Sequence, residues 1–591
     1  MLKQWKIKDK APLEFFEQFK NYHPIAAQLL YNRGLKNESD ALKFFNPDYN
    51  QLHDPFLFKD MAKAVERILS AIENKEKIIV HGDYDADGVT SAAVLFKILK
   101  ALGADVEVFI PHREWDGYGL NLENAQNFVD CGFKLLITVD CGITNVKEIE
   151  FLNKFGVDVI VTDHHEPLEI LPEAVAILDP KTKDSGYPFR DLAGVGIAFK
   201  LACALIENEK TLRQAQGKLE KLKNGKTNYD GLLKWMLDIV AIGTVADVAP
   251  LMDENRILVK WGLVVLQKTQ NLGLQKLIKK ISTKKIDSFT IGFQLAPRLN
   301  AAGRMNHANA AFKLLISEDE EEASQLADDL QKNNQDRQRI TEAAVDKAKE
   351  FIAQMEIDQK ILFAFHEEWE PGIIGLIAGK LCDEFYRPVI VMTKSKERVV
   401  GSGRSVPGFN ITQGLTTVSA MLSRFGGHSQ ACGFTLTDIN VKENFQNELA
   451  AHAKSVLADV ELTPSLDIDA EIKIKDISWD LLNQLELFAP YGEGNLRPRF
   501  LISGLDIAAL DKVGGDGQHL RLSVKQDLPR VYKMMGFSLA KKNLPSQSSG
   551  KAGGFKPGEK IDAVCEVGIN EWNGNREFEF KIVDLKYSNH E

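Results

Sequence analysis

Three carboxylates and one imidazole lie within seven residues of this chain, in the segment His81-Gly82-Asp83-Tyr84-Asp85-Ala86-Asp87. Carboxylates so close together repel one another unless a cation lies among them, so metal binding explains the segment economically. The alternative is an acidic loop that only caps the following helix through Asp87 or Thr90. Taken alone, this segment leaves both interpretations open.

Two further segments carry residues of the same types at the end of an apolar run. One is Val139-Asp140-Cys141-Gly142, and the other is Thr162-Asp163-His164-His165. Taken singly, Asp140 could be an ordinary helix N-cap and His164 a packed or solvated histidine. If the apolar runs are parallel strands, however, all three segments lie at one edge of a sheet, and a shared site becomes the better explanation.

A fourth candidate is Asp247, an acid embedded in the apolar run 241–248. An unpaired charge in such a run would be costly, so Asp247 is expected to have a partner. Asp238 is a rival acid in the same stretch, with a plainer explanation as a residue of a helix.

The chemistry of these candidate ligands favours particular metals. Oxygen and imidazole ligands without thiolates favour Mn²⁺ or Mg²⁺ over structural Zn²⁺. The number of acids suggests two ions, which lie about 3.5–4 Å apart in two-metal hydrolases and share a bridging carboxylate. Such a pair activates water and neutralises a phosphoryl group, so the chemistry points to phosphoester hydrolysis.

The elements that must position these residues are the apolar runs 77–80, 106–110, 135–139 and 157–161. They alternate with helical stretches such as 90–102, a pattern typical of βαβ units and of a parallel sheet covered on both faces. Functional groups of such sheets collect just past the carboxyl ends of the strands. The sequence therefore predicts an α/β domain whose acidic segments meet at one sheet edge.

The rest of the chain divides into segments of different character. Residues 1–72 are expected to be short helices, the last of them spanning 60–74. Residues 194–316 are more helical and contain a polar insert at 214–228. Residues 317–355 predict a long connecting helix, with Ser317 as N-cap and Glu320 at the third helical position. A second α/β unit follows to about residue 457, and short strands with a hairpin turn at Asn573-Gly574 predict a small C-terminal barrel.

The predicted architecture is thus an α/β multidomain protein. Its expected parts are a helical lead-in (1–72), a parallel-sheet catalytic domain (73–316), a connecting helix (317–355), a second α/β domain (356–458) and a β-barrel (466–591). Hydrophobic residues make up 44% of the 591 residues and charged ones 26%, values that exclude wholesale disorder and collagen-like sequence.

The net charge of -10 excludes a uniformly basic nucleic-acid-binding surface but not a local one. Between residues 505 and 560, ten Lys or Arg against five Asp or Glu give +5. The six cysteines are scattered, which indicates a reducing compartment. No stretch approaches the ~20 apolar residues that cross a bilayer, so we expect a cytoplasmic protein without a membrane partner.

Together, the segments HGDYDADG (81–88), VDCG (139–142), DHH (163–165) and GTVADVAPL (243–251) resemble the DHH phosphoesterase superfamily. The resemblance implies that one ion is held by His81, Asp85 and Asp140. It implies that the other is held by Asp87, Asp140, His164 and Asp247, so that Asp140 bridges the two. It also implies catalytic roles for His165, which would stabilise charge on the scissile phosphate, and for Asp83, which would support the site or contact substrate.

The second half of the chain is similar to one member family. Residues 369–375, 387–390, 401–405 and 425–434 resemble the DHH-associated domain, and residues 298–304, the long helix and the OB-type barrel complete the layout of the RecJ family of single-stranded-DNA exonucleases. The resemblance implies an exonuclease that degrades single-stranded DNA from the 5′ end, releases 5′-mononucleotides and acts in DNA recombination and repair. It also implies two partners, a single-strand-binding protein and a RecQ-type helicase.

Several residues are candidates for phosphate contacts, because glycine admits backbone amides and arginine offers bidentate contacts. The resemblance carries Ser402, Arg404 and Arg113 onto a pocket for the terminal 5′-phosphate, although a surface turn would also explain Ser402 and Arg404. The other candidates are Arg298, Arg304, Gly426, Gly427 and His428. For the last three, a tight turn with a packed histidine is the alternative.

Other functions stay open at this stage. A phosphodiesterase for short oligonucleotides or cyclic dinucleotides would use the same chemistry, but the extra barrel argues against it. A non-catalytic strand-binding scaffold is disfavoured because every expected ligand position is occupied. In the barrel, Tyr532, Phe537 and Trp572 are candidates for base stacking, or else core residues.

Overall fold

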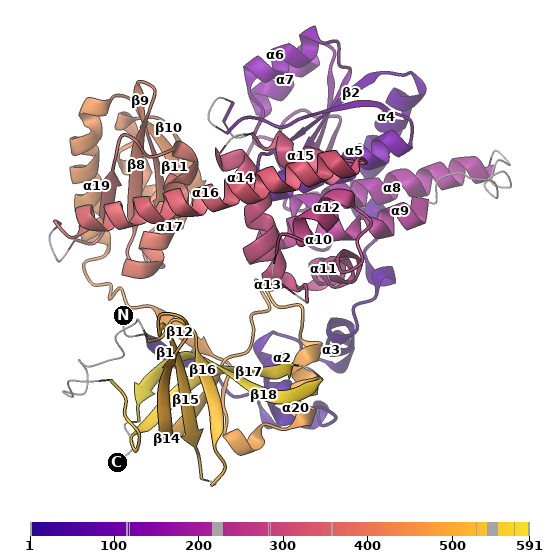
Figure 1. Cartoon of the computed structure of the whole chain (residues 1–591). Coiled ribbons are helices and arrows are strands. Elements are labelled where there is room, and N and C mark those ends of the chain that lie inside the picture. Colours follow the sequence, from indigo (N-terminus) through magenta and orange to yellow (C-terminus); the bar gives the residue numbers. More distant parts are fainter. Residues whose placement is uncertain are drawn as a thin grey trace. The chain divides into compact units, whose positions relative to one another are not determined.

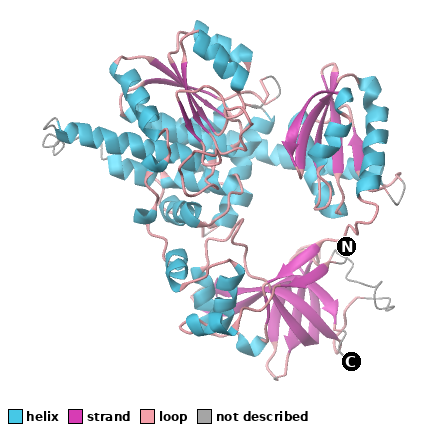
Figure 2. Cartoon of the chain, turned by 180° about the vertical axis from the view of Figure 1, so that it is seen from behind, coloured by secondary structure: helices cyan, strands magenta, loops and turns pink. Residues whose placement is uncertain are grey.

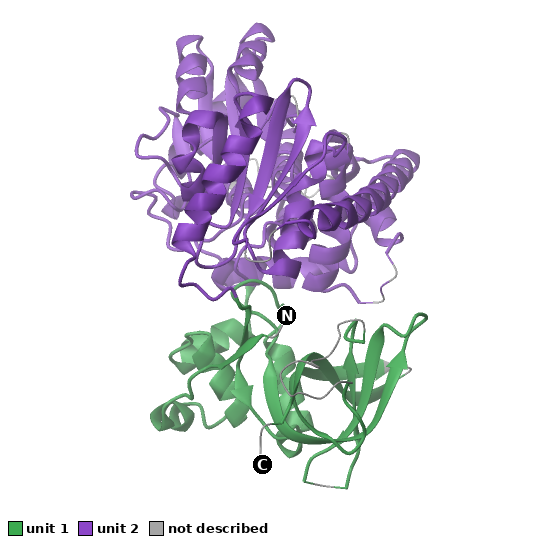
Figure 3. Cartoon of the chain, turned by 90° about the vertical axis from the view of Figure 1, so that its left-hand side faces the viewer, with its two compact units in different colours: residues 1–48, 463–591 green, residues 49–462 purple. Residues whose placement is uncertain are grey.

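The computed structural model describes residues 3–588 apart from residues 114, 115, 118, 216–228, 282, 284, 306, 356–358, 528, 541–553 and 573. The chain forms two compact units (Figure 3). One unit consists of residues 49–462, and the other joins residues 1–48 to residues 463–591. None of the helices within the described ranges is both long enough and apolar enough to span a membrane.

The larger unit contains a five-stranded parallel sheet in the order β3-β2-β4-β5-β6. Its strands are β2 (Lys77–Gly82), β3 (Asp105–Phe109), β4 (Leu135–Val139), β5 (Asp158–Thr162) and β6 (Ala176–Leu178). Every residue of β4 is buried, as expected for a central strand covered by helices on both faces (Figure 2). The four predicted apolar runs are confirmed as neighbouring parallel strands. The three-residue strand β6 was not predicted, because so short a strand carries too little pattern.

Two helices next to this sheet test the predicted boundaries. The helix α4 (Met61–Glu73) matches the predicted helix 60–74. The helix α5 (Ala86–Ala101) begins four residues before the predicted start at Thr90. The reason is its N-cap, Asp85, whose side chain accepts hydrogen bonds from the backbone N–H groups of Asp87 and Gly88 at 2.8 and 3.1 Å. The acidic segment therefore caps a helix, but through Asp85 and not through Asp87 or Thr90.

The predicted helical stretch after the sheet is also observed. It comprises α8 (Gly194–Ala215), α9 (Tyr229–Trp235), α10 (Leu237–Ala246), α11 (Asp253–Leu266), α12 (Leu272–Ile278), α13 (Ser288–Thr290), the π-helical turn η4 (Ile291–Leu295), α14 (Ala296–Met305) and α15 (Asn309–Ile316). Two further helices, α6 (Leu122–Asp130) and α7 (Val146–Lys154), connect strands of the sheet. Most of the polar insert predicted at 214–228 lies outside the described residues.

The long connecting helix is present as α16 (Glu320–Ile352), and it crosses the larger unit in Figure 1. The predicted N-cap is wrong: Asp319, not Ser317, accepts a hydrogen bond from the backbone N–H of Glu322, at 2.7 Å. The Ser317 hydroxyl instead donates to the carboxylate of Glu322 at 2.6 Å. In the sequence Ser-Glu-Asp-Glu, both serine and aspartate can cap a helix, and the helix begins directly after the aspartate, Asp319.

The second α/β domain carries a five-stranded sheet in the order β10-β11-β9-β8-β7. Its elements are β7 (Leu362–Phe365), α17 (Pro371–Phe385), β8 (Val389–Ser395), β9 (Arg398–Arg404), α18 (Ile411–Thr417), β10 (Leu422–His428), β11 (Ala431–Leu436) and α19 (Lys442–Val456). Only β7 and β8 pair in parallel; the other strands are antiparallel.

The smaller unit is built around a closed barrel, which confirms the predicted C-terminal fold. The strands pair in the order β13-β14-β15-β16-β18-β17, and β14 also pairs with β17. They are β13 (Ala470–Glu471), β14 (Phe500–Val513), β15 (His519–Lys525), β16 (Tyr532–Gly536), β17 (Lys560–Trp572) and β18 (Asn575–Tyr587). At the place of the predicted hairpin, Trp572 of β17 pairs with Asn575 of β18, and Asn573 of the predicted turn lies outside the described residues.

The N-terminal segment divides differently from the expected lead-in 1–72. Residues 1–48 belong to the barrel unit, where β1 (Gln4–Ile7) pairs in parallel with β12 (Ser465–Ile468). This part of the barrel unit also contains the helices α1 (Leu13–Gln18), α2 (Pro24–Asn32) and α3 (Glu38–Phe45). The helix α20 (Trp479–Leu487) contacts both α2 and the barrel strand β17. The aromatic ring of Phe488, which follows α20, contacts both Phe44 and Phe45. Strand β1 is mostly exposed, so its sequence lacks the apolar run that would have revealed it.

Candidate metal centre

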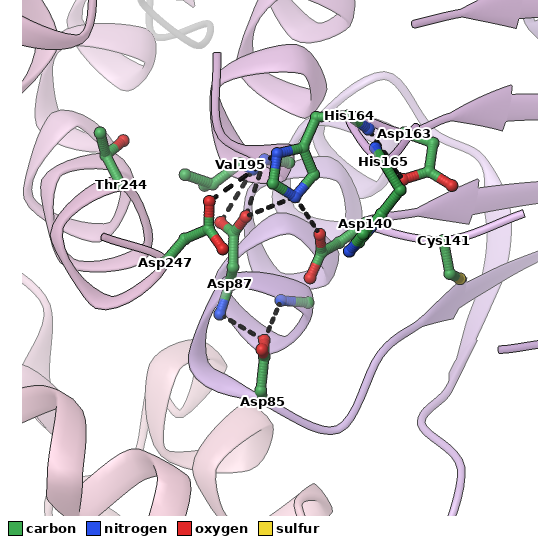
Figure 4. A network of polar contacts seen from close by, with 12 residues as sticks. Asp85, Asp87, Asp140, Cys141, Asp163, His164, His165, Val195, Thr244 and Asp247 are labelled. Carbon is green, nitrogen blue, oxygen red and sulfur yellow. Dashed lines mark hydrogen bonds and ion pairs between the residues drawn. The ribbon is translucent and has the colours of Figure 1, made fainter. Parts of the chain in front are cut away.

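The acidic segments meet just past the carboxyl ends of β2, β4 and β5 (Figure 4). Within this site, three groups of side chains each place their ligand atoms within 4.8 Å of one another. The groups are Asp83–Asp85–Asp140, Asp87–His164–Asp247 and Asp140–His164–His165. Asp140 and His164 each belong to two groups, so the site is one continuous cluster.

The imidazole of His164 lies at the centre of the cluster. Its Nε2 is 3.0 Å from Asp140 Oδ1 and 4.0 Å from Asp87 Oδ2, and its Nδ1 is 3.7 Å from Asp247 Oδ2. Burial, followed by the neighbouring His165, lowers the pKa of His164 to about 3. His164 is therefore a neutral imidazole with a lone pair to offer, the form that binds metals.

The carboxylates of the cluster have raised pKa values. Burial is the largest cause in each case, and the charges of neighbouring carboxylates add to it. The pKa values of Asp83, Asp87 and Asp140 lie well above the usual range, and that of Asp247 rises to about 7. The protein alone does not stabilise these negative charges, whereas divalent cations among them would.

Several buried polar atoms in the site support this fit to metal ions. Asp140 Oδ1 and His164 Nε2 are buried and lie 3.0 Å apart without forming a hydrogen bond. Both ring nitrogens of His81 and Oδ1 of Asp83 are also buried without a hydrogen-bond partner. Buried polar atoms are nearly always satisfied, so unpaired lone pairs gathered at one point fit a cation-binding site. Oxygen and neutral nitrogen donors of this kind suit Mn²⁺ or Mg²⁺.

His81 lies at the end of β2 and is fully buried, but it belongs to none of the three groups. Its ring stacks on Phe109, with centroids 5.6 Å apart and an interplanar angle of 11°. Burial lowers its pKa to about 4 and keeps the imidazole neutral. The structure therefore places His81 in the wall of the site in a protonation state that allows ligation.

His165 differs from His164 because Asp163 holds it. Asp163 Oδ1 lies 2.7 Å from Nδ1 of His165 and also accepts the backbone N–H of His164 at 2.7 Å, while its Oδ2 accepts the N–H of Ile143. Burial alone would lower the pKa of His165, but the hydrogen bond and the charge of Asp163 outweigh it and raise the pKa. His165 is thus a cation-forming imidazole fixed beside the carboxylate cluster.

Backbone groups that the sequence analysis did not identify hold Asp87 in place. The N–H groups of Gly194 and Val195, at the N-terminus of α8, donate to Asp87 Oδ2 and Oδ1 at 2.7 and 3.0 Å. A Cβ on Gly194 would approach both Cβ and Oδ1 of Asp140 to 2.7 Å. The sequence signal that could have predicted this contact is the pair of glycines, Gly194 and Gly196, at the start of an apolar helix, because helix N-termini bind anionic groups.

A second support comes from α14. The side-chain Oδ1 of Asn300 accepts the backbone N–H of Ala86 at 2.8 Å, and Gly303 leaves room for the carbonyl of Tyr84, which a Cβ would meet at 2.7 Å. The segment 298–304 was identified as a motif in the sequence, but its role in buttressing the metal loop was not.

The structure separates the two rival acids of α10. Asp247 is the C-cap of the helix and faces the cluster. Asp238 is buried elsewhere, where its carboxylate accepts hydrogen bonds from the Thr269 hydroxyl and the N–H of Ile239. Burial raises the pKa of Asp238 to about 6. Asp238 is therefore a structural residue, and Asp247 is the candidate ligand.

Ser402 and Arg404 lie on β9 of the second α/β domain. Arg404 Nη1 donates to the Gly403 carbonyl at 2.9 Å and to Ser402 Oγ at 3.3 Å. A Cβ on Gly375 of α17 would lie 3.2 Å from Ser402 Oγ and 3.3 Å from Arg404 Nη2. The glycine therefore keeps the face of these two side chains open, as a phosphate site requires.

Gly426, Gly427 and His428 lie on the neighbouring hairpin of β10 and β11, where Gly427 pairs with Cys432 and His428 with Ala431. All three are exposed. Gly427 adopts a φ of +141°, and a Cβ there would meet the carbonyl of Ala431 at 2.3 Å, so this position requires glycine. The structure thus brings these residues to the same sheet as Ser402 and Arg404.

Three of the predicted arginines, Arg113, Arg304 and Arg404, lie close enough for their positive charges to affect one another's pKa values. Burial lowers the pKa of Arg304 to about 9, and the charges of Arg113 and Arg337 contribute, while Asp85 opposes the shift. Burial also lowers the pKa of Arg404, and Arg113 again contributes. Arg113 stands over the Tyr84 ring at 5.0 Å, and Arg304 donates to the Gly372 carbonyl at 3.2 Å. Repelling cations beside a metal cluster suit a bound polyanion. Arg337, on α16, was not identified from the sequence.

The remaining candidates lie apart from this cluster. Arg298 donates from Nε to Gln331 Oε1 and from Nη1 to the carbonyl of Gln294, at 2.7 and 2.5 Å. In the barrel, Phe537 is 54% exposed, so it is available for stacking, whereas Tyr532 is half-buried against Phe580. The side chain of Trp572 lies outside the described residues.

Sequence comparison identifies three known domains in this chain. The DHH family, N-terminal domain, matches residues 77–244. The DHHA1 domain matches residues 358–455, and the RecJ OB domain matches residues 468–584. The three matches lie in the parallel-sheet domain, the second α/β domain and the barrel.

Characterised relatives and solved structures resemble nearly the whole chain. The chain is 36% identical to the single-stranded-DNA-specific exonuclease RecJ of Bacillus subtilis, over 99% of this chain and 71% of the relative. Identity to the RecJ of Thermus thermophilus is 31%, over 99% and 78% of the two chains. The crystal structure of Thermus thermophilus RecJ with Mn²⁺ matches with a TM-score of 0.81 at 28% identity, over 99% of this chain and 80% of that one. A structure of the same protein with Mg²⁺ matches with a TM-score of 0.75.

Proposed function

Because the chain belongs to the RecJ family of single-stranded-DNA-specific exonucleases, we propose that it degrades single-stranded DNA from the 5′ end and releases 5′-mononucleotides in DNA recombination and repair. It is a metal-dependent phosphodiesterase, and its cofactors are Mn²⁺ or Mg²⁺. The observation that carries the mechanism is the position of Asp140, shared by two ligand groups at the sheet edge.

The side chains divide between two ions in this proposal. His81, Asp85 and Asp140 would hold one, and Asp87, Asp140, His164 and Asp247 would hold the other. Two divalent cations bound there would supply an activated water and neutralise the charge on a phosphoryl group. The overlap of the ligand groups at Asp140 and the neutral state of both His81 and His164 support this division.

The protein's own groups position the substrate around this centre. Asp163 fixes the ring of His165, whose positive charge would lie beside the scissile phosphate. Asp83 lies beside Asp85 and Asp140, where it would support the site or contact the substrate. Arg304 and Arg113, between the metal cluster and β9, would neutralise the strand's phosphates as it enters.

The domain boundaries and cellular context complete the proposal. The catalytic domain comprises residues 73–316, the connecting helix 317–355, the second α/β domain 356–458 and the nucleic-acid-binding barrel 466–591; the ranges of the three matched domains support this division. The +5 charge of residues 505–560 supports strand binding by the barrel. We also propose that the protein works in the cytoplasm with a single-strand-binding protein and a RecQ-type helicase.

A DNA strand labelled at either end tests the direction and the product. We expect a 5′ label to appear at once in mononucleotides, and a 3′ label to remain on shortening strands, in the presence of Mn²⁺ or Mg²⁺. Duplex DNA should be resistant. Faster cleavage of dinucleotides than of long strands would instead favour an oligonucleotide phosphodiesterase, and the absence of any metal-dependent cleavage would favour a strand-binding scaffold.

Replacing Arg404 with alanine should lower kcat/KM on 5′-phosphorylated DNA by roughly 10- to 100-fold, the range for loss of a hydrogen bond to a charged group. On DNA with a 5′-hydroxyl the variant should match the unmodified protein, because the contact is absent in both. Arg398→Ala, at the exposed start of the same strand, is the matched control and should change neither rate. An equal loss on both substrates would show that Arg404 does not bind the terminal phosphate.

A further inference from the structure

Two phenylalanines on the catalytic domain expose their rings to solvent. Phe289 is 59% exposed and Phe293 is 69% exposed. They lie four residues apart on α13 and the π-helical turn η4, and their rings stack with centroids 4.5 Å apart at 25°. The opposite face of the same segment is anchored, because Ile291 and Leu295 are fully buried. The rings are therefore held in place, and an exposed aromatic pair on a rigid element indicates a binding surface.

The segment that carries the aromatic pair packs on α10, the helix whose C-cap is the candidate ligand Asp247. Gly292, between the two phenylalanines, faces α10 so closely that a Cβ there would be 3.6 Å from Val245 Cγ1. Val245 precedes the candidate ligand Asp247 by two residues, and Val248, just beyond it, is 63% exposed. The anchored side of η4 thus packs on α10, the helix that presents Asp247, and the two aromatic rings on the other side are exposed.

The same segment continues to the other parts of the site. The turn η4 runs directly into α14, whose Asn300 supports the metal loop and whose Arg304 reaches the second α/β domain. Phe293 precedes Asn300 by seven residues, so at a helical rise of ~1.5 Å per residue the two lie about 10 Å apart along the segment. A stack of about three bases, at ~3.4 Å each, has the same length. Arg298 lies between them, and in the described part of the chain it forms no ion pair with a carboxylate. A strand leaving the metal centre along α14 would meet this cation and then the two rings.

We propose that Phe289 and Phe293 form a base-stacking platform for the single strand, about three nucleotides to the 3′ side of the scissile phosphate. The direction follows from the order along the segment, because Arg304 lies at the end near the proposed 5′-phosphate pocket and the rings lie at the opposite end. Base stacking on aromatic rings tolerates any sequence, which suits a nuclease that must advance along every strand. The proposal rests on the proposed exonuclease function and assigns the substrate contacts beyond its reactive end.

The test compares Phe293→Ala and the double variant Phe289→Ala/Phe293→Ala with the unmodified full-length protein. Both rings are exposed, so neither variant should lose stability. On a 5′-phosphorylated strand of 30 nucleotides, kcat/KM should fall about tenfold, within the range for loss of one stacked base. On a 5′-phosphorylated dinucleotide, which is too short to reach the platform, the rate should not change. Phe293→Trp should retain activity on both substrates.

An abasic residue in the DNA gives an independent readout. Placed at successive positions from the 5′ end, it should weaken binding to the unmodified protein most at about the third and fourth nucleotides. The double variant should bind the abasic DNA and the intact DNA with the same affinity. Equal activity of all variants on the long strand, or an abasic effect that persists in the double variant, would overturn the platform. If the unmodified protein itself fails to degrade the 5′-phosphorylated strand, the exonuclease function fails and not the platform alone.

Discussion

Replacing Asp140 with asparagine is expected to lower the rate of nucleotide release by at least about 1000-fold, since a single preorganised electrostatic group can contribute that much. Asp140 lies in two of the three ligand groups, so its loss removes a donor from both proposed ions. Asparagine is the appropriate substitution because the residue adopts a φ of +60°, a conformation that asparagine tolerates better than alanine. Rates on 5′-labelled single strands in Mn²⁺ and in Mg²⁺ measure the effect.

Metal binding and stability provide a second readout for the same variant. The pKa of Asp140 is raised by burial and by neighbouring carboxylates, so the ionised group disfavours the folded state at neutral pH. Without metal, Asp140→Asn should therefore unfold at the same or a higher temperature than the unmodified protein. The increase in Tm on addition of Mn²⁺ should shrink, because ligands that bind only the folded state stabilise it.

Asp238→Asn is the matched control for this experiment. Asp238 is also a buried aspartate with a raised pKa, but it bonds to Thr269 and contributes to none of the ligand groups. Its replacement should leave both nucleotide release and the response to Mn²⁺ unchanged. Full activity of Asp140→Asn, or equal losses in the two variants, would require the two-metal assignment to be abandoned.

Replacing Gly194 with alanine should lower activity by about 100-fold, the effect expected when reacting groups are displaced by about 1 Å. The new Cβ would lie 2.7 Å from both Cβ and Oδ1 of Asp140, so either Asp140 or the start of α8 must move. Movement of α8 would in turn disturb the two N–H groups that hold Asp87. Either adjustment changes the position of a proposed metal ligand.

This loss should occur although alanine is a better helix former than glycine by about 1 kcal/mol. The same assay on Gly196→Ala controls for helix propensity, because a Cβ there meets only the flexible end of the Leu192 side chain, at 3.0 Å. We expect that variant to keep most of its activity. If Gly194→Ala were as active as Gly196→Ala, the precise position of Asp140 would not limit the reaction.

Local pattern was sufficient for much of the fold. The runs 77–80, 106–110, 135–139 and 157–161 became strands of one parallel sheet because continuous apolar runs between helices have few other stable arrangements. The cap of α16 was misplaced by two residues, since serine and aspartate both cap helices and only the backbone geometry selects between them. Strand β1 was missed because it is mostly exposed and so lacks an apolar run, and its partner β12, more than 450 residues away in the sequence, gives no local signal for it.

By itself, the sequence identified the candidate ligands that follow β2, β4 and β5 and the edge of the sheet on which they meet. That inference needed only residue types and the rule that parallel strands end together, which are local properties. Tertiary structure alone decided what holds those ligands: the N–H of Gly194 reaches Asp87 across 107 residues, and Asn300 reaches Ala86 across 214. It also decided that Asp238 packs away from the site and that Phe289 and Phe293 face solvent. Contacts of this kind depend on how helices pack on the sheet, and packing is set by side-chain shapes distributed over the whole domain and not by any one segment.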